Sequence, residues 1–118
     1  MEVILGGKVF RMDIADSYAV QERGLSGHKP LLDDQGMIFI FPRSDIYYFW
    51  MKGMLYPLDI IWVDQNFKII HIEKSLSSDT YPKTFGPSSP SLYVLEISAG
   101  ESLKLGLKIG DSVEFVEK

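Results

Sequence analysis

The chain has 118 residues, a net charge of −4 and a hydrophobic fraction of 46%, which is enough to fill the core of one domain. Its 12 basic and 16 acidic residues lack the Lys and Arg excess that binding to a phosphate backbone requires, so we expect no nucleic-acid partner. Cysteine is absent, which excludes disulfide scaffolds, thiolate catalysis, iron–sulfur clusters and cysteine-based zinc sites.

The first predicted elements are a strand and a short helix. Residues 8–14 alternate between polar and apolar, which predicts a strand with one buried face. That face carries Phe10, Met12 and Ile14. Asp16 is a suitable N-cap, and Gly24 a suitable C-terminal residue, for a helix over 17–23.

Four strands are predicted in the middle of the chain, over residues 37–41, 46–52, 57–63 and 67–73. The first of them is apolar on both faces and ends at Pro42, which is typical of a strand covered on both sides. The last two are joined by residues 64–66, where Asn66 tolerates the positive φ of a hairpin turn.

Residues 74–91 carry three prolines and six serines without an apolar period, which predicts a long loop. A loop of this length inside a small domain is usually a lid or a binding loop. A strand over 92–97, a helical turn over 100–105 and a final strand over 113–116 complete the chain.

These elements predict one mainly β domain over residues 1–118. Six to eight short strands without regular strand–helix alternation favour a small β-barrel or a jelly-roll-like sandwich with one or two short helices. No apolar run approaches the roughly 20 residues of a membrane span, and the first residues carry no signal-peptide pattern. We therefore expect a soluble, cytoplasmic protein, or an extracytoplasmic one if a leader or anchor was removed.

Eight of the 15 aromatic residues lie between residues 39 and 62, and polar residues are embedded among them. Trp50 and Lys52 share a face of their predicted strand. Lys52 and Asp59 flank the connection over residues 53–58. Asp59 is either a structural carboxylate, held by Lys52 or by backbone N–H groups, or part of a ligand pocket with Trp50 as its wall. The structural interpretation is favoured, because buried ion pairs often serve no chemistry.

Glu96 interrupts an apolar strand and therefore raises the same question. Arg23, at the end of the predicted helix, is a suitable bidentate partner for its carboxylate. Glu22, beside Arg23, has the ordinary position of a solvated acidic residue on a short helix. Carboxylates near an aromatic wall would also suit general acid/base work on a sugar, for which Asp59 and Glu96 are the candidates.

Metal and nucleotide sites find no support in the sequence. His28 and His71 are the only histidines, and neither belongs to a spacing typical of metal ligands. The serines of the long loop lack a nucleophile-elbow pattern, and no Gly-rich phosphate loop opens a helix. We expect no metal, no cofactor and no assigned catalytic residue.

Five stretches follow one another in a recognisable order, at residues 21–27, 36–42, 49–61, 93–100 and 110–113. The most specific is Phe-Trp-Met-Lys at residues 49–52, followed by Pro-Leu-Asp at residues 57–59. Together they resemble the uncharacterised family known as domain of unknown function 192, over nearly the whole chain. The chain has Gly53 where the family usually has Asn, and Ser98 where it usually has Pro, which puts in doubt any role for a polar side chain at position 53.

The resemblance implies a small barrel-like or jelly-roll-like β domain with short helices, and no established activity. It also implies bacterial or archaeal relatives, many of them exported or tethered to a membrane. The polar positions shared with the family are Glu22, Arg23, Lys52, Asp59 and Glu96.

Three functions are consistent with these observations. The first is a non-enzymatic module that binds a small polar or carbohydrate-like ligand against Trp50, with Lys52 and Asp59 orienting the ligand and residues 74–91 as a lid. The alternatives are a carboxylate-based hydrolase using Asp59 and Glu96, and a protein-interaction domain with an exposed aromatic patch. The sequence leaves the oligomeric state open.

Overall fold

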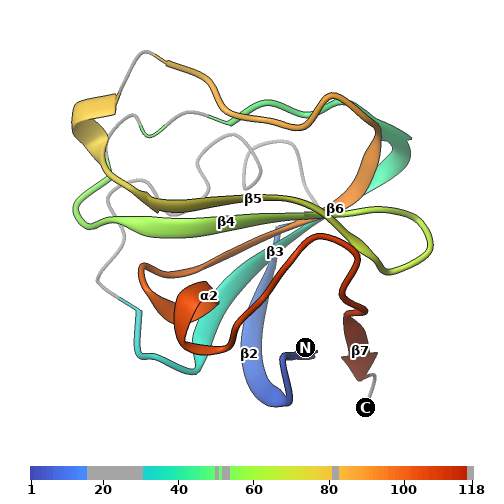
Figure 1. Ribbon diagram of the computed structural model, residues 1–118, viewed down its shortest axis with the longest axis horizontal. Helices are drawn as coiled ribbons and strands as arrows, with labels where there is room; N and C mark the ends of the chain where they lie inside the picture. The colour runs from blue at the N-terminus through green and yellow to red at the C-terminus, as the bar shows by residue number, and fades with distance from the viewer. Residues whose placement is uncertain (16–30, 50, 52–53, 81–82, 117–118) are drawn as a thin grey trace.

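The computed structural model describes residues 1–15, 31–49, 51, 54–80 and 83–116, and these form a mainly β domain (Figure 1). The helix predicted over 17–23 lies outside the described residues. The strands are β1 (Glu2–Leu5), β2 (Lys8–Ala15), β3 (Gln35–Asp45), β4 (Leu58–Val63), β5 (Ile69–Leu76), β6 (Ser91–Ser98) and β7 (Glu114–Val116). A 3₁₀ turn, η1 (Ser78–Thr80), and a short helix, α2 (Glu101–Lys104), lie between strands.

The seven strands form one curled half-barrel sheet in the order β5-β4-β6-β3-β2-β1-β7. Among the described strands, β2 and β3 run parallel and the other neighbouring pairs are antiparallel. The two edges approach each other where the N–H of Ile69 donates to the carbonyl of Asp111 (2.9 Å) and that of Val113 to the carbonyl of Phe67 (2.8 Å). The predicted mainly β class with a short helix is therefore confirmed, with a half-barrel as its architecture.

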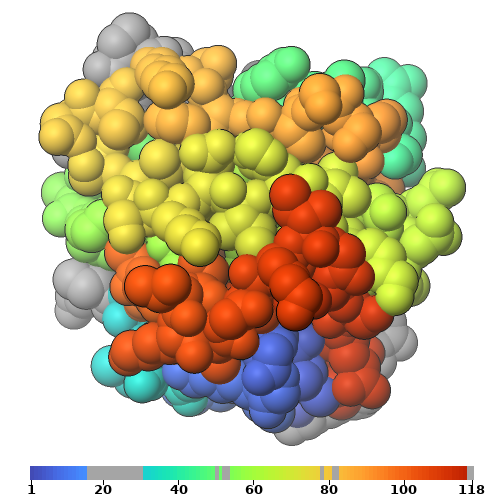
Figure 2. All heavy atoms as spheres, in the orientation of Figure 1, coloured from blue at the N-terminus to red at the C-terminus, as the bar shows by residue number. Residues whose placement is uncertain are grey.

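The chain between β6 and β7 closes the open side of the half-barrel. In Figure 1 it runs through α2 and continues along the lower side of β4 and β5 toward β7. Figure 2 shows the same segment, in orange and red, filling the surface between β5 in yellow and the β1–β2 hairpin in blue. Leu105 and Leu107 of this segment lie against the turn at Gly6.

Each face of the sheet carries its own apolar core, because side chains alternate between the faces along a strand. We call the core inside the curl the inner core; its buried members are Val3, Leu5, Phe10, Met12, Ile38, Ile61, Val63, Ile69, Leu95, Ile97, Leu107 and Val113. The outer core, on the opposite face, consists of Ala15, Met37, Phe39, Met51, Met54, Leu58, Ile60, Trp62, Leu76, Phe85 and Val94. Every residue of β4 is buried, since both cores cover it.

The strand predictions at 57–63, 92–97 and 113–116 and the helical turn at 100–105 correspond to β4, β6, β7 and α2. The buried face predicted for residues 8–14 holds for Phe10 and Met12, whereas Ile14 is 44% exposed. Strand β3 also continues past Pro42, contrary to the predicted end. The pairing of β3 with β6 is irregular between Ile40 and Asp45, and an irregular ladder tolerates a residue without an N–H.

The predicted strand over 46–52 is wrong for the residues that the structure describes there. Phe49 makes only an isolated bridge, exchanging hydrogen bonds with Phe85 at 2.8 and 2.7 Å. Phe49 and Met51 pack into the outer core, so this segment covers the sheet instead of extending it. The loop in the structure is shorter than the predicted range of 74–91, because β5 runs to Leu76 and β6 begins at Ser91. The 3₁₀ turn η1 also lies within this loop.

Two turns differ from expectation. The hairpin before β2 was not predicted, although Gly6 and Gly7 take the positive φ values of 55° and 82° that a two-residue turn uses. In the turn after β4, Phe67 takes the positive φ (61°) that was predicted for Asn66. The Oδ1 of Asp64 accepts hydrogen bonds from the N–H groups of Asn66 (2.9 Å) and Lys68 (3.0 Å), which holds Asn66 in place.

The close contact at Gly36 provides a test of this packing. A Cβ there would lie 2.5 Å from the carbonyl oxygen of Glu96 and 2.7 Å from the Sδ of Met12. We expect Gly36→Ala to lower the free energy of unfolding by about 1–3 kcal/mol in denaturant titrations, because β3 and β6 must separate. The control Ser44→Ala, at an exposed position of the same strand, should change it by less than about 0.5 kcal/mol. Equal effects of the two substitutions would contradict the packing.

Candidate functional site

Of the six candidate residues, the structure describes Asp59 and Glu96. Glu22, Arg23, Trp50 and Lys52 lie outside the described residues, and so do the expected pairs Lys52–Asp59 and Arg23–Glu96.

Asp59 lies on β4 and is fully buried. Its Oδ1 accepts hydrogen bonds from the N–H groups of Ser75 (2.9 Å) and Gly100 (3.3 Å). Its Oδ2 accepts from the N–H of Ser102 (2.9 Å) and from the Ser102 hydroxyl (2.6 Å). Four donors therefore compensate the buried charge, and both oxygens are engaged within the fold.

These hydrogen bonds fix α2 against the sheet. A second buried carboxylate, Glu101, ties the same helix to Lys8 of β2 (2.5 Å) and also pairs with Lys104 within the helix (3.4 Å). The hydrogen bond from Lys8 is the main reason why the pKa of Glu101 lies below its usual value. The same hydrogen bond raises the pKa of Lys8. Asp59 and Glu101 thus anchor the segment that closes the half-barrel.

Asp59 and Glu96 point to opposite faces of the sheet. Paired residues on neighbouring antiparallel strands share a face, and Asp59 pairs with Ile97 whereas Ile60 pairs with Glu96. Ile97 belongs to the inner core and Ile60 to the outer core. The sheet therefore separates the two carboxyl groups.

Glu96 lies on the outer face and is only 5% exposed. Its neighbours across the strands are Met37 of β3 and Ile60 of β4, both apolar. No described residue donates a hydrogen bond to its Oε1. Burial without a charged partner among the described residues raises the pKa of Glu96 to about 8, so the carboxyl is mostly protonated at pH 7.

The hydroxyl of Tyr56 is the second unpaired polar atom on this face. It is buried, and no described residue forms a hydrogen bond with it. Tyr56 packs against the outer core, and burial, followed by the charge of Glu96, raises its pKa. We call Tyr56 and Glu96 the outer polar pair. Tyr56 belongs to the aromatic cluster of residues 39–62 and was not predicted as a site residue, although its place in the stretch 49–61 is a signal that could have identified it.

Aromatic and methionine side chains surround this part of the outer face. Phe49 lies edge-on to Phe39 (5.0 Å between ring centres) and to Trp62 (5.9 Å). The Trp62 indole N–H donates to the carbonyl of Tyr47 (3.0 Å), and Met51 and Met54 complete the cover. On β5, beyond Trp62, the Nε2 of His71 lies 2.7 Å from Glu73 Oε2.

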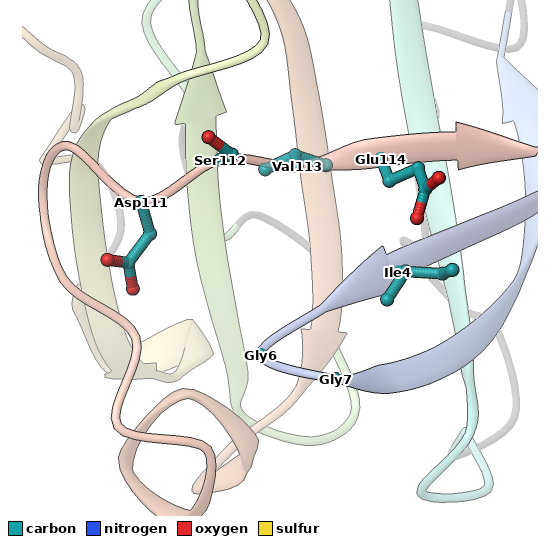
Figure 3. Close-up of a pocket in the computed structure, with 7 residues that line it drawn as sticks. All are labelled: Ile4, Gly6, Gly7, Asp111, Ser112, Val113 and Glu114. Carbon is teal, nitrogen blue, oxygen red and sulfur yellow. The ribbon is translucent and has the colours of Figure 1, made fainter.

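Two surface hollows among the described residues lie elsewhere. One, of about 460 Å³, lies between the β1–β2 turn and the approach to β7, and Figure 3 shows Asp111 and Glu114 on one wall and Gly6 and Gly7 on the other. The second, of about 640 Å³, is lined by Met1, Glu2, Arg11, Met12, Asp13, Ile14, Ile40 and Val116. Neither contains Asp59, Glu96 or Tyr56.

Over the part of the chain that the structure describes, no three His, Asp or Glu side chains are grouped so that they could hold a metal ion. Within the same residues, no helix has the length and apolar character to cross a membrane.

Removal of the Asp59 carboxylate should be strongly destabilising. Asp59→Ala leaves the buried N–H and hydroxyl of Ser102, and the partly buried N–H groups of Ser75 and Gly100, without an acceptor. We therefore expect a loss of roughly 3–5 kcal/mol in the free energy of unfolding. Asp59→Asn, which retains one acceptor, should lose less. Chemical denaturation measures both, with Asp13→Ala at an exposed position of β2 as control. A loss under about 0.5 kcal/mol for Asp59→Ala would show that the anchor contributes nothing.

The buried Glu96 should make stability depend on pH. Because its pKa in the folded state (about 8) lies above the ordinary value of 4.5, the folded state binds more protons between these values, and stability falls as the pH rises. The fall should approach 1.4 kcal/mol per pH unit. Glu96→Gln should remove it, so that the variant gains stability relative to the wild type from pH 5 to pH 8 in denaturant titrations. Glu114→Gln, at an exposed position, is the control. If the free energy of unfolding depends on pH in the same way in the wild type and in Glu96→Gln, the Glu96 carboxyl is not buried in its protonated form.

Comparison with known proteins places the chain in a family without assigned chemistry. No curated protein matches it. A crystal structure of a protein of unknown function from Novosphingobium aromaticivorans DSM 12444 is similar, with a TM-score of 0.88 and 35% identity over 97% of this chain and 84% of that one. A candidate transcription regulator from Sinorhizobium meliloti 1021 has a TM-score of 0.86 and 26% identity over 96% of this chain and 89% of its own. The sequence profile of DUF192, described as an uncharacterized ACR, matches residues 1–115, and the chain belongs to this family.

Proposed function

We propose that the domain is a non-enzymatic module that binds a small polar ligand on the outer face of the half-barrel, at the outer polar pair. The observation that carries the proposal is that Glu96 Oε1 and the Tyr56 hydroxyl are both buried on this face without a hydrogen-bond partner among the described residues. An unpaired buried polar atom costs about 1–3 kcal/mol, so a ligand that pairs with both atoms recovers that energy.

The surroundings support a ligand site. Small-ligand sites typically combine an apolar and aromatic wall with a few convergent polar groups. Phe49, Trp62 and Met54 supply apolar and aromatic groups of this kind in the outer core against which Tyr56 packs. Leu55, next to Tyr56, is 69% exposed, so this part of the covering segment meets solvent.

The proposal retains part of the site expected from the sequence and changes the rest. Trp50 and Lys52 belong to the same covering stretch of chain as Tyr56. We keep Trp50 as a ligand-contacting candidate, and Lys52 as one only for a ligand without a positive charge. Asp59 is left out, because its two oxygens are already engaged on the inner side. Phe85 of the loop packs in the outer core, so the loop is close enough to serve as a cover.

The other functions receive less support. A hydrolase would need a second carboxylate near Glu96, and Asp59 lies on the opposite face. One structural neighbour is named as a candidate transcription regulator. A role of that kind through direct nucleic-acid binding would need a basic surface, whereas this chain has 12 basic and 16 acidic residues.

Ligand titrations followed by amide chemical shifts test the proposal. With glucose, galactose, glycerol, choline and acetate as probes, we expect at least one to shift the amides of residues flanking the pair, such as Met37, Ile60 and Val94. Tyr56→Phe should weaken that binding by about 2- to 10-fold, the value of one hydrogen bond. Glu96→Leu, which keeps the outer core apolar, should abolish it.

Tyr93→Phe is the matched control, since Tyr93 packs against the inner core and should leave binding unchanged. The proposal fails if none of the probes shifts the flanking amides. It also fails if the shifts map to the hollow of Figure 3 and persist in Glu96→Leu.

A further inference from the structure

Resting on the proposed function, we infer that the ligand carries an organic ammonium group, which binds opposite the Glu96 carboxylate and displaces its proton to solvent. Three features of the outer face favour a ligand of this class: the burial of the Glu96 carboxyl, the charges that face it and the aromatic rings of the outer core.

The charges on this face favour a cation. Met37 and Ile60, on either side of Glu96 in the sheet, are apolar, and Tyr56 contributes only a hydroxyl. The next charged groups on the face are Glu73 and His71 of β5, beyond Ile60 and Trp62, and Lys83, whose ammonium group lies over the Phe85 ring. Glu73 and His71 contact each other at 2.7 Å, so the carboxylate of Glu73 accompanies any charge on His71. No described cation forms an ion pair with Glu96, and its direct neighbours Met37 and Ile60 carry no charge that would repel an incoming ammonium group.

The aromatic rings favour the same class of ligand. An ammonium group is attracted to the face of an aromatic ring within about 6 Å of its centre. The outer core already shows one such contact, since the Lys83 ammonium lies 5.1 Å from the centre of the Phe85 ring. Tyr56, Phe49 and Trp62 offer further rings in the same core.

The exchange balances in charge and protons. Before binding, the carboxyl of Glu96 holds a proton, because burial raises its pKa to about 8. Binding of the ammonium ligand forms an ion pair with the carboxylate, and the carboxyl proton passes to water. The apparent affinity should therefore rise about tenfold per pH unit below pH 8 and become constant above it. A neutral ligand of the same shape would not gain affinity in this way.

Choline and its neutral isostere 3,3-dimethylbutan-1-ol test the inference on the full chain, because choline keeps its charge at every pH. Chemical-shift titrations from pH 5.5 to pH 9 should give choline an affinity that rises by at least 30-fold and then levels off, whereas the isostere shows no such rise. Glu96→Gln should remove the pH dependence and weaken choline binding at pH 8.5 by at least tenfold. Glu73→Gln is the matched control and should retain the pH dependence.

Three outcomes would overturn the inference. The first is equal binding of choline and its isostere, and the second is choline binding that does not depend on pH. The third is a measured pKa of Glu96 that lies below 5 in the ligand-free wild type and above 5 in Arg23→Ala. Arg23 would then be the partner of the Glu96 carboxylate. If glucose or glycerol binds at the pair and choline does not, the inference fails while the proposed function stands; if no probe binds there, both fail.

Discussion

The carboxylate of Asp59 joins three parts of the fold that are far apart in the sequence. Asp59 lies on β4. Its carboxylate accepts hydrogen bonds from the N–H of Ser75 at the end of β5, and from the N–H groups of Gly100 and Ser102 at the start of α2. A half-barrel exposes its inner core unless another segment covers the open side, and here the residues after β6 do so. The packing of Leu105 and Leu107 against the N-terminal hairpin depends on where α2 is held. The covering of the inner core by this segment therefore depends on the hydrogen bonds that Asp59 accepts.

The two buried carboxyl groups of the central strands differ in how the cost of their burial is met. Both oxygens of Asp59 accept hydrogen bonds from donors within the fold. Glu96, one strand away and on the other face, has apolar neighbours and retains a proton. A purely structural role would be served better by an apolar residue at position 96, because a buried carboxyl without partners destabilises the protein. This contrast directs the search for function to the outer face.

Local patterns predicted much of the sheet, and long-range contacts decided the rest. Alternation and apolar runs located β4, β6 and β7, and turn residues located α2. The segment around Phe49 has the composition of a strand, yet it covers the sheet instead of joining it. Composition indicates that a segment is buried, but not whether its backbone pairs with a neighbouring strand. Asp59 and Glu96 were both recognised as buried carboxyls that need an explanation. Their surroundings were not predictable, since the partners of Asp59 lie 16 to 43 residues further along the chain.

The pairing of β1 with β7 brings the first and last strands of the described sheet side by side, with Glu2 opposite Val116. During synthesis the N-terminal hairpin leaves the ribosome early, but one edge of β1 stays unpaired until nearly the whole domain has emerged. The sheet is thus completed late, through contacts of maximal sequence separation, which is the arrangement associated with slow folding. The same adjacency means that linking the two ends by a short peptide, and opening the chain at an exposed turn, would preserve every strand pair.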